Sequence, residues 1–430
     1  MKGRLNLFQA AMLRWRSLHP YSAVHAVHVE LPLDALRLSA VIDGELQALG
    51  LTGLTLDARR KRYEYAGGPS HAPLAVVNAG DDPLHALARE IERELNTPFE
   101  SDGALVPFRF VAIEGRTSFH LALTYDHWIA AADSIVVLLK GLRDAYLGVA
   151  APRQAPLLLY PATTRRLFRL HARDAIRGLR RMREIAASAR RSVRARYPGG
   201  DDPGNGFVYC RVDPPDFAVA VRTAKAWGVT VNDLLLAVLM QVLDPVAGER
   251  PSDKRRHELA VASIVNVRAD FGYDATTTFG QFLSSFRVAH ALPPGTSLRE
   301  LARDIHAETS RTKNEKLYMQ TLLAIVALAG IWHVLSPTRR QGFHAKHYPV
   351  WGAISMMNVD AQWRDAGGEL PPPEYVRAVS TGPLAPLVIA ATTAAGVLHA
   401  GFSYRTAAFT PEKVAAIAAD FRERIALIGR

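Results

Sequence analysis

The sequence has little cysteine, and that scarcity excludes several classes of protein. Cys210 is the only cysteine among 430 residues, so no disulfide can form within the chain and a disulfide-stabilised secreted fold is excluded. Iron–sulfur clusters and cysteine-rich zinc sites are excluded for the same reason. A reducing compartment is the simplest location. We expect the cytoplasm, with attachment to the inner face of the membrane as an alternative.

Long apolar runs are missing too. No stretch reaches about eighteen consecutive apolar residues, the length typical of a membrane-spanning helix. The nearest candidate runs from Thr321 to Leu335 and contains Gly330 and His333. Its length favours a buried helix, and a lipid-facing or acyl-lining helix and a membrane span remain as alternatives. At the N-terminus, Arg14 and Arg16 interrupt the apolar stretch that a signal peptide requires.

Several nucleotide, metal and nucleophile motifs are absent as well. The sequence has no Walker A loop, GxGxxG, GxSxG or HExxH pattern. His25 and His28 are three residues apart on one predicted strand, so they face opposite sides and do not form a metal pair. We therefore expect no metal and no permanently bound cofactor.

Net positive charge is concentrated in one segment, and the rest of the chain is close to neutral. The net charge is +11, and residues 165–196 hold twelve arginines against two acids, Asp174 and Glu184, a local net charge of +10. Apolar residues recur there at helical spacing. The segment is either a solvated crossover helix or a docking surface for an acidic acyl carrier protein, the phosphates of coenzyme A or an anionic membrane surface. Nucleic acid is disfavoured because no aromatic residues alternate with the arginines.

Strand-like and helix-like patterns alternate along the chain, both before and after this basic segment. This alternation predicts an α/β fold with an N-terminal subdomain over residues 1–160, a basic helical crossover linker over 161–204 and a C-terminal subdomain over 205–430. Within the first half, strands are predicted over 108–114 and 117–125, and a helix over 135–146.

The stretch between the second of these strands and the helix, TYDHWIAAADSI, carries the most chemical information. A histidine at such a turn, His127, is suited to take a proton from an alcohol or amine near neutral pH. The stretch resembles the HHxxxDG motif of the chloramphenicol-acetyltransferase-like superfamily. That superfamily includes condensation domains, BAHD acyltransferases, and wax-ester and alcohol acyltransferases. In this comparison Asp126 and His127 replace the two histidines, Ala131 and Ala132 replace the Asp and Gly, and Ser134 matches a common serine.

Further segments resemble the family in the same order along the chain. They are the N-terminal NLFQ and HPYS, a WGVTVNDLLLA stretch, a VNVR strand followed by FGQF, and a final GFSYR strand with Phe409-Thr410. The resemblance implies two chloramphenicol-acetyltransferase-like subdomains forming a pseudo-dimer with a central tunnel.

The resemblance also implies a mechanism. An acyl thioester, on a carrier protein or on coenzyme A, would enter the tunnel from one face, and an alcohol or amine acceptor from the other. His127 would remove the acceptor's proton as general base, with no covalent acyl-enzyme, so Cys210 needs no role. Ser355 and Asn358 occupy positions where relatives carry a tunnel-lining pair and are candidates for the tunnel or for oxyanion support.

The motif departs from the family at the turn that holds the histidine. The family's Asp pairs with an arginine, for which Arg268 is the candidate here, but Ala131 has replaced the Asp. Asp133 either takes over that pairing or caps the helix expected at Ile135. We expect Asp126, Asp133, Ser134 and Arg268 to support the turn. The sequence favours an acyltransferase, and Ala131 and Ala132 favour the alternative, a catalytically inactive condensation-like module that binds or docks.

Overall fold

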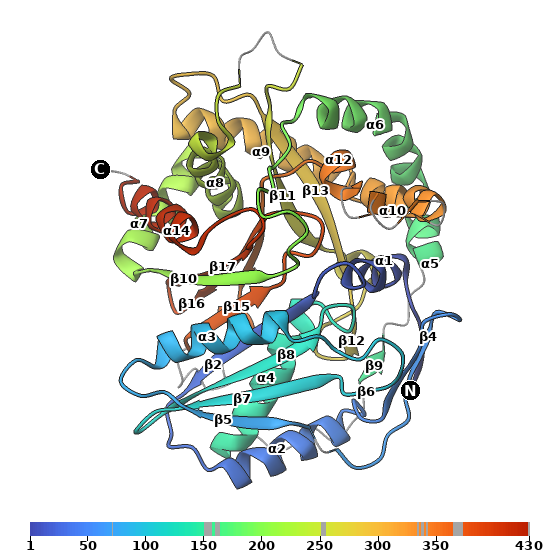
Figure 1. Cartoon of the computed structure of the whole chain (residues 1–430), viewed down its shortest axis with the longest axis vertical. Helices are drawn as coiled ribbons and strands as arrows, with labels where there is room; N and C mark the ends of the chain where they lie inside the picture. The colour runs from blue at the N-terminus through green and yellow to red at the C-terminus, as the bar shows by residue number, and fades with distance from the viewer. Residues whose placement is uncertain are drawn as a thin grey trace. The chain divides into compact units, whose positions relative to one another are not determined.

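The computed structural model describes residues 1–70, 72–149, 157–159, 164–250, 255–332, 335–336, 339–340, 343–363 and 373–428 (Figure 1). It confirms the predicted α/β class. The chain forms two compact units. Unit 1 comprises Met1–Leu167, Asn266–Leu283 and Asn358–Ser380, and unit 2 comprises Phe168–Val265, Ser284–Met357 and Thr381–Arg430.

Unit 1 contains a five-stranded sheet, two small sheets and flanking helices. Its elements are β1 (Lys2–Arg4), α1 (Leu7–Arg16), β2 (Ser22–Val29), α2 (Ala35–Ala48), β3 (Leu54–Asp57), β4 (Arg62–Tyr65), β5 (Leu74–Asn78), α3 (Pro83–Asn96), β6 (Gly103–Leu105), β7 (Phe108–Glu114), β8 (Phe119–Asp126), α4 (Ala132–Leu147), β9 (Leu158–Leu159), a 3-10 turn (Ala269–Phe271), β12 (Thr278–Phe279), α13 (Asp360–Trp363) and β15 (Tyr375–Val379), and α5 (Thr164–Leu170) begins in it.

The central strand of the large sheet in unit 1 is β8. The strand order is β15-β2-β8-β7-β5, and the small sheets are β1-β4-β3-β6 and β12-β9. All eight residues of β8 are buried, because α3 packs on the sheet and neighbouring strands cover both edges. A fully buried central strand is a rigid support for the residue that follows it, His127.

Unit 2 contains the other large sheet. Its elements are α6 (Ala172–Arg191), β10 (Asn205–Val212), α7 (Pro214–Trp227), α8 (Val231–Ala247), β11 (Leu259–Asn266), β13 (Leu283–His290), α9 (Leu298–Asn314), α10 (Met319–Trp332), α12 (Phe343–His347), β14 (Gly352–Asn358), β16 (Leu387–Ala394), β17 (Val397–Arg405) and α14 (Pro411–Ala426). The strand order is β10-β17-β16-β14-β11-β13, which makes β13 an edge strand.

Helix starts follow the local chemistry of the sequence. Asp82 caps α3 by accepting a hydrogen bond from the His85 backbone N–H, and Pro83 occupies the first turn. At α8, Thr230 and Asp233 form a reciprocal capping box. The predicted strand over 108–114 is confirmed as β7. The helix expected over 135–146 begins three residues earlier, at Ala132, so Asp133 and Ser134 lie in its first turn.

The predicted subdomain ranges follow chain order, and the two compact units do not. The segment Asn266–Leu283 belongs to unit 1 although it lies within the predicted range 205–430. So does Asn358–Ser380, because β15 pairs with β2 from Tyr375↔Val27 to Val379↔Ala23. The predicted boundary at 160/161 lies outside the described residues.

The apolar segment from Thr321 is part of α10. Met319 and Leu322 are buried, and residues 323–325 are half-buried, whereas His333 lies outside the described residues. Among the residues that the structure describes, no single helix is long and apolar enough to cross a membrane. The pair α7 and α8 reaches that length and composition only together, across a bend of 104°.

Candidate functional site

The connection from β8 to α4 is fixed by backbone hydrogen bonds on both sides of His127. The His127 N–H donates to the Tyr21 carbonyl at 3.1 Å. Gln281 Nε2 donates to the His127 carbonyl at 2.6 Å and to the Ala130 carbonyl at 3.1 Å. The turn is therefore tied to β2 on one side and to the segment before β13 on the other.

The imidazole of His127 is half-buried and presents its two nitrogens differently. Nδ1 is fully buried and has no hydrogen-bond partner among the described residues. Nε2 is not among the buried polar atoms that lack a partner. The ring stands 5.3 Å from the Tyr21 ring and 6.1 Å from the Tyr125 ring, measured between centroids. These two aromatic rings limit the positions that the imidazole can take.

The electrostatic surroundings keep this imidazole neutral. Burial lowers the pKa of His127 to about 4; the backbone of Ala130 raises it, and the positive charge of Arg377 lowers it further. Arg377 lies on β15, opposite His25 of β2. At neutral pH the ring therefore carries no proton on one nitrogen, which is the state that a general base requires.

Asp126, the residue before His127, links the end of β8 to α1. Its carboxylate forms an ion pair with Arg16 Nη1. Burial raises the pKa of Asp126 to about 6, and Arg16 and Trp128 oppose that increase. Arg16, Tyr21 and Asp126 also line a cavity of about 180 Å³ in unit 1.

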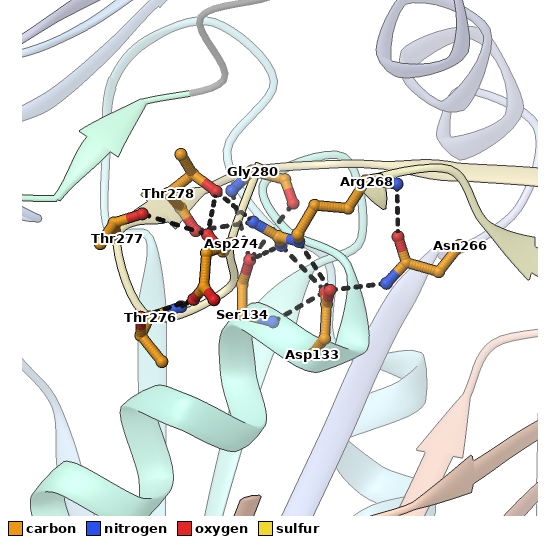
Figure 2. A network of polar contacts seen from close by, with 9 residues as sticks. All are labelled: Asp133, Ser134, Asn266, Arg268, Asp274, Thr276, Thr277, Thr278 and Gly280. Atoms are coloured by element: carbon orange, nitrogen blue, oxygen red, sulfur yellow. Dashed lines mark hydrogen bonds and ion pairs between the residues drawn. The ribbon is translucent and has the colours of Figure 1, made fainter. Parts of the chain in front are cut away.

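The turn is closed by a bidentate ion pair between Asp133 and Arg268 (Figure 2). Arg268 Nε donates to Asp133 Oδ2 at 2.7 Å, and Nη2 donates to Asp133 Oδ1 at 3.0 Å. Asn266 Nδ2 adds a bond to Oδ2 at 2.6 Å. Both charged residues are buried, at 6% and 4% exposure. Asp133 pairs with Arg268, and its Oδ1 also accepts a hydrogen bond from the Ser134 backbone N–H at 2.9 Å in the first turn of α4, whose N-cap is Ala131.

Every N–H of Arg268 is engaged. Nη1 donates to the backbone carbonyl and the hydroxyl of Thr278, at 2.8 and 2.6 Å, and the remaining Nη2 donor reaches Ser134 Oγ at 2.6 Å. Its guanidinium also lies 4.0 Å from the centre of the Phe282 ring. A buried arginine with all five donors satisfied is a structural anchor. It holds α4 against the segment that precedes β13.

The two alanines of the motif fit this turn without strain. Ala131 has φ −82° and ψ 158°, which is ordinary extended backbone, and Ala132 is the first helical residue. Neither is among the described non-glycine residues with positive φ. The left-handed conformation that would favour glycine is not adopted here.

Ser355 and Asn358 both lie on β14. Ser355 lies in the part of β14 that belongs to unit 2, and Asn358 lies in unit 1. The Asn358 side chain accepts a hydrogen bond from the Asp360 backbone N–H at 2.8 Å, at the start of α13. A role in a tunnel or in oxyanion support stays a prediction for both. Cys210 is buried, and burial raises the pKa of its thiol to about 11.

Three residues around His127 were not predicted from the sequence: Arg16, Gln281 and Arg377. Gln281 lies in the FGQF segment that carried the resemblance, but nothing in that segment indicated that its side chain contacts the His127 turn. Arg16 and Arg377 contact or influence the turn from β-strand or helix positions far along the chain. No local pattern in the sequence connects them with His127.

Comparison with known proteins identifies the fold. No protein-family model matches the sequence, and no curated protein matches it. Solved structures do match. The first condensation domain of the CDA synthetase aligns with a TM-score of 0.69 over 100% of this chain and 96% of that chain, at 16% identity. SgcC5 from Streptomyces globisporus, solved with (R)-(-)-1-(2-naphthyl)-1,2-ethanediol and sucrose, aligns with a TM-score of 0.65 over 98% of both chains, at 16% identity.

The same fold is found in proteins named for other reactions. The epimerization domain from the third module of tyrocidine synthetase B aligns with a TM-score of 0.64 at 12% identity, over 100% of this chain and 96% of that chain. The fold alone therefore does not determine the reaction. What the comparisons establish is that this chain has the fold of condensation domains.

Proposed function

We propose that this protein is a condensation-type acyltransferase that moves an acyl group from a thioester donor to an alcohol or amine, with His127 as the general base. The observation that carries the proposal is the state of His127: a neutral, half-buried imidazole at the end of a buried strand, with Nδ1 buried and without a partner among the described residues. The condensation-domain fold supports the class of reaction.

The proposed step needs only the donor, the acceptor and this imidazole. The acceptor oxygen or nitrogen attacks the thioester carbonyl carbon while Nε2 of His127 takes its proton. The tetrahedral intermediate then collapses, the C–S bond breaks, and the imidazolium returns the proton to the departing thiolate. The ester or amide and a free thiol are the products, and the enzyme is unchanged. Holding both reactants beside one neutral base supplies the acceleration.

The donor we infer is a thioester on an acidic carrier protein or on coenzyme A. The support is the outer face of α6 in unit 2, where Arg173, Arg177, Arg180 and Arg183 are exposed together with Ile176. Exposed arginines around an apolar residue favour an anionic partner. Reversing the charge of Arg173 and Arg180 to Glu is expected to raise KM for the preferred donor and to weaken the salt dependence of KM. If KM and its salt dependence are both unchanged in this charge-reversal variant, α6 does not take part in donor binding.

The decisive experiment measures thiol release and acyl transfer by the purified chain. Acyl-coenzyme A and acyl-phosphopantetheinyl carrier proteins serve as donors, and a panel of alcohols and amines as acceptors. Replacing His127 by Ala is expected to lower the rate by about 100-fold or more, the usual contribution of a general base. The matched control is His85→Ala, because His85 is an exposed histidine on α3 in the same unit.

A wild-type rate equal to that of the His127→Ala variant on every donor would contradict the proposal. The second candidate, an inactive binding module, rests on the replacement of the motif Asp and Gly by Ala131 and Ala132. It predicts that acyl carrier protein binds with no turnover.

The pH profile tests the same residue independently. Because the pKa of His127 lies at about 4, the ring stays neutral as pH falls from 7 to 5. The acid limb of kcat/KM is therefore expected well below 6.5, the ordinary pKa of histidine. An acid limb centred near 6.5 would show that a different, solvated base carries the reaction.

A further inference from the structure

A cavity with no assigned role lies within unit 2. It is bounded by α6, β13, α9 and α10, and its volume is about 380 Å³. That value falls in the roughly 300–1,000 Å³ range of small-molecule pockets. All of its lining residues belong to unit 2, whereas His127 belongs to unit 1.

Most charged groups that line the cavity are paired with one another or with a neighbour. Among the lining arginines, Arg181, Arg191 and Arg311 each lie 2.5–3.6 Å from a carboxylate oxygen. These ion pairs neutralise their charges locally, so they leave no net demand for a ligand.

The carboxylates show the same pattern. Glu184 and Glu258 are partners of those arginines, and Asp304 lies 3.3 Å from His290 Nε2. After this pairing one cation and one anion remain on the wall: Arg287 and Glu308.

Arg287 is the unpaired cation. Its Nε donates to the Pro349 carbonyl at 3.3 Å, and Nη2 donates to Ser192 Oγ at 2.7 Å. In the described part of the chain no carboxylate lies within 4 Å of it, although three arginines nearby have such partners. A guanidinium held by two neutral acceptors keeps its charge, and it is geometrically suited to a carboxylate.

Glu308 on α9 is the unpaired anion. Burial raises the pKa of Glu308, and Arg181, which pairs with Glu315, lowers it only in part. None of the described cations lies within ion-pair distance. Glu308 is an exposed residue, whereas Gln320 of α10 is 3% exposed, and its amide Nε2 and Oε1 have no partner among the described residues. A buried amide without partners is costly unless something binds it.

We propose that this cavity binds a small zwitterion, a free amino acid, with the ligand carboxylate on Arg287 and the ligand ammonium on Glu308. The Gln320 amide completes the polar contacts by donating to the carboxylate or accepting from the ammonium. The apolar walls include Phe286 and Ile305, which suits a ligand with a hydrocarbon side chain. This site is independent of His127, and its test does not require turnover.

The test is calorimetric titration of the full chain with four matched compounds. L-leucine carries both charges, 4-methylpentanoate lacks the ammonium, isopentylamine lacks the carboxylate, and 6-aminohexanoate separates the two charges by a longer chain. We expect one of the two zwitterions to bind at least about tenfold more tightly than either single-charge compound. Which zwitterion binds better reports the spacing of the two charges.

Two variants assign the contacts. Glu308→Gln is expected to abolish the preference for the zwitterion over 4-methylpentanoate. Gln320→Leu is expected to weaken all binding while raising the melting temperature of the free protein, because it removes an unsatisfied buried amide. Glu423→Gln, at an exposed glutamate on α14 of the same unit, is the matched control and should bind as wild type.

Three results would overturn the proposal. One is the absence of binding by any of the four compounds in the millimolar range. Another is binding of 4-methylpentanoate as tight as that of both zwitterions, which would indicate a simple anion site. The third is an unchanged zwitterion preference in Glu308→Gln.

Discussion

Two buried aspartates, one in each unit, lie near the start of a helix and are used differently. Asp133 lies in the first turn of α4 and Asp233 in the first turn of α8, at 6% and 0% exposure. Asp233 closes a local capping box with Thr230 and accepts hydrogen bonds from Thr309 and His306 of α9. Asp133 makes one local bond, accepting from the Ser134 backbone N–H at 2.9 Å, and it is not the N-cap residue of α4. Its main partner is Arg268, 135 residues away along the chain.

The difference shows what each carboxylate stabilises. The Asp233 bonds organise the start of α8 through the capping box and join it to α9, whose two partner residues lie 73 and 76 positions further along the chain in unit 2. The Asp133–Arg268 pair joins segments of unit 1 that are distant in sequence, and the turn that it holds carries His127. The first network stabilises a helix. The second also positions the proposed base, so the two should respond differently to mutation.

The largest effect is expected from Arg268→Ala. It leaves the Asp133 carboxylate buried without its cation and costs about 3–5 kcal/mol of unfolding free energy. Because the turn is released, acyl transfer should fall together with stability. Chemical denaturation and thiol release measure the two effects. Arg222→Ala, at an exposed arginine on α7, is the control. A stable Arg268→Ala protein with full activity would show that the pair does not hold the turn.

Asp233→Ala is expected to cost about 2–3 kcal/mol, because the Thr230 N–H, the Thr309 hydroxyl and the His306 ring lose their acceptor. The pH profile of acyl transfer should not move, since the hydrogen bonds of Asp233 go to Thr230, Thr309 and His306. Denaturation and kcat/KM across pH, measured below the melting temperature of the variant, check both parts. A shifted acid limb in this variant would couple the two networks and remove the contrast.

The two regions also differ in how pH affects their contribution to stability. The pKa of His127 is about 4 in the folded chain and about 6.5 unfolded. The unfolded state therefore binds more protons between those values, and stability falls as pH falls. Asp126, with a pKa of about 6 folded and about 3.9 unfolded, acts in the opposite direction over nearly the same window. Hydrogen bonds to Thr230, Thr309 and His306 outweigh burial and lower the pKa of Asp233, so it stays ionised throughout.

Three variants, His127→Gln, Asp126→Asn and Asp233→Asn, should give different slopes when the free energy of unfolding is plotted against pH from 6.5 to 4. Relative to wild type, His127→Gln should make the protein gain stability as pH falls, and Asp126→Asn should make it lose stability. Each change is at most about 1.4 kcal/mol for each pH unit. Asp233→Asn should leave the slope as it is. Equal slopes in all four proteins would mean that neither His127 nor Asp126 has a shifted pKa.

The contrast also shows what could be predicted from the sequence. The capping box of Thr230 and Asp233 could be predicted, because a Thr-x-x-Asp pattern before an apolar helix is typical of such a box. The α/β class, β7 and most helix starts follow from such short-range patterns. The resemblance to a family strand indicated Arg268 as a candidate partner. The spacing of the residues did not show whether Asp133 pairs with Arg268 or caps the helix. Gln281 and Arg377 depend on tertiary packing, which leaves no local signal in one sequence.

The smallest effect is expected from Thr230→Ala, and it tests how local the Asp233 network is. The variant removes the cap hydroxyl but leaves the Asp233 carboxylate bound to Thr309 and His306. The loss should be about 1 kcal/mol, the usual value of an N-cap, measured by denaturation beside Asp233→Ala. The Thr230 hydroxyl donates to the Asp233 carboxylate and also accepts from the Asp233 backbone N–H at 3.2 Å, so the double variant Thr230→Ala/Asp233→Ala should be less stable than Asp233→Ala alone, by the part of the cap that does not act through the carboxylate. A loss that adds fully in the double variant would show that Thr230 and Asp233 stabilise α8 independently.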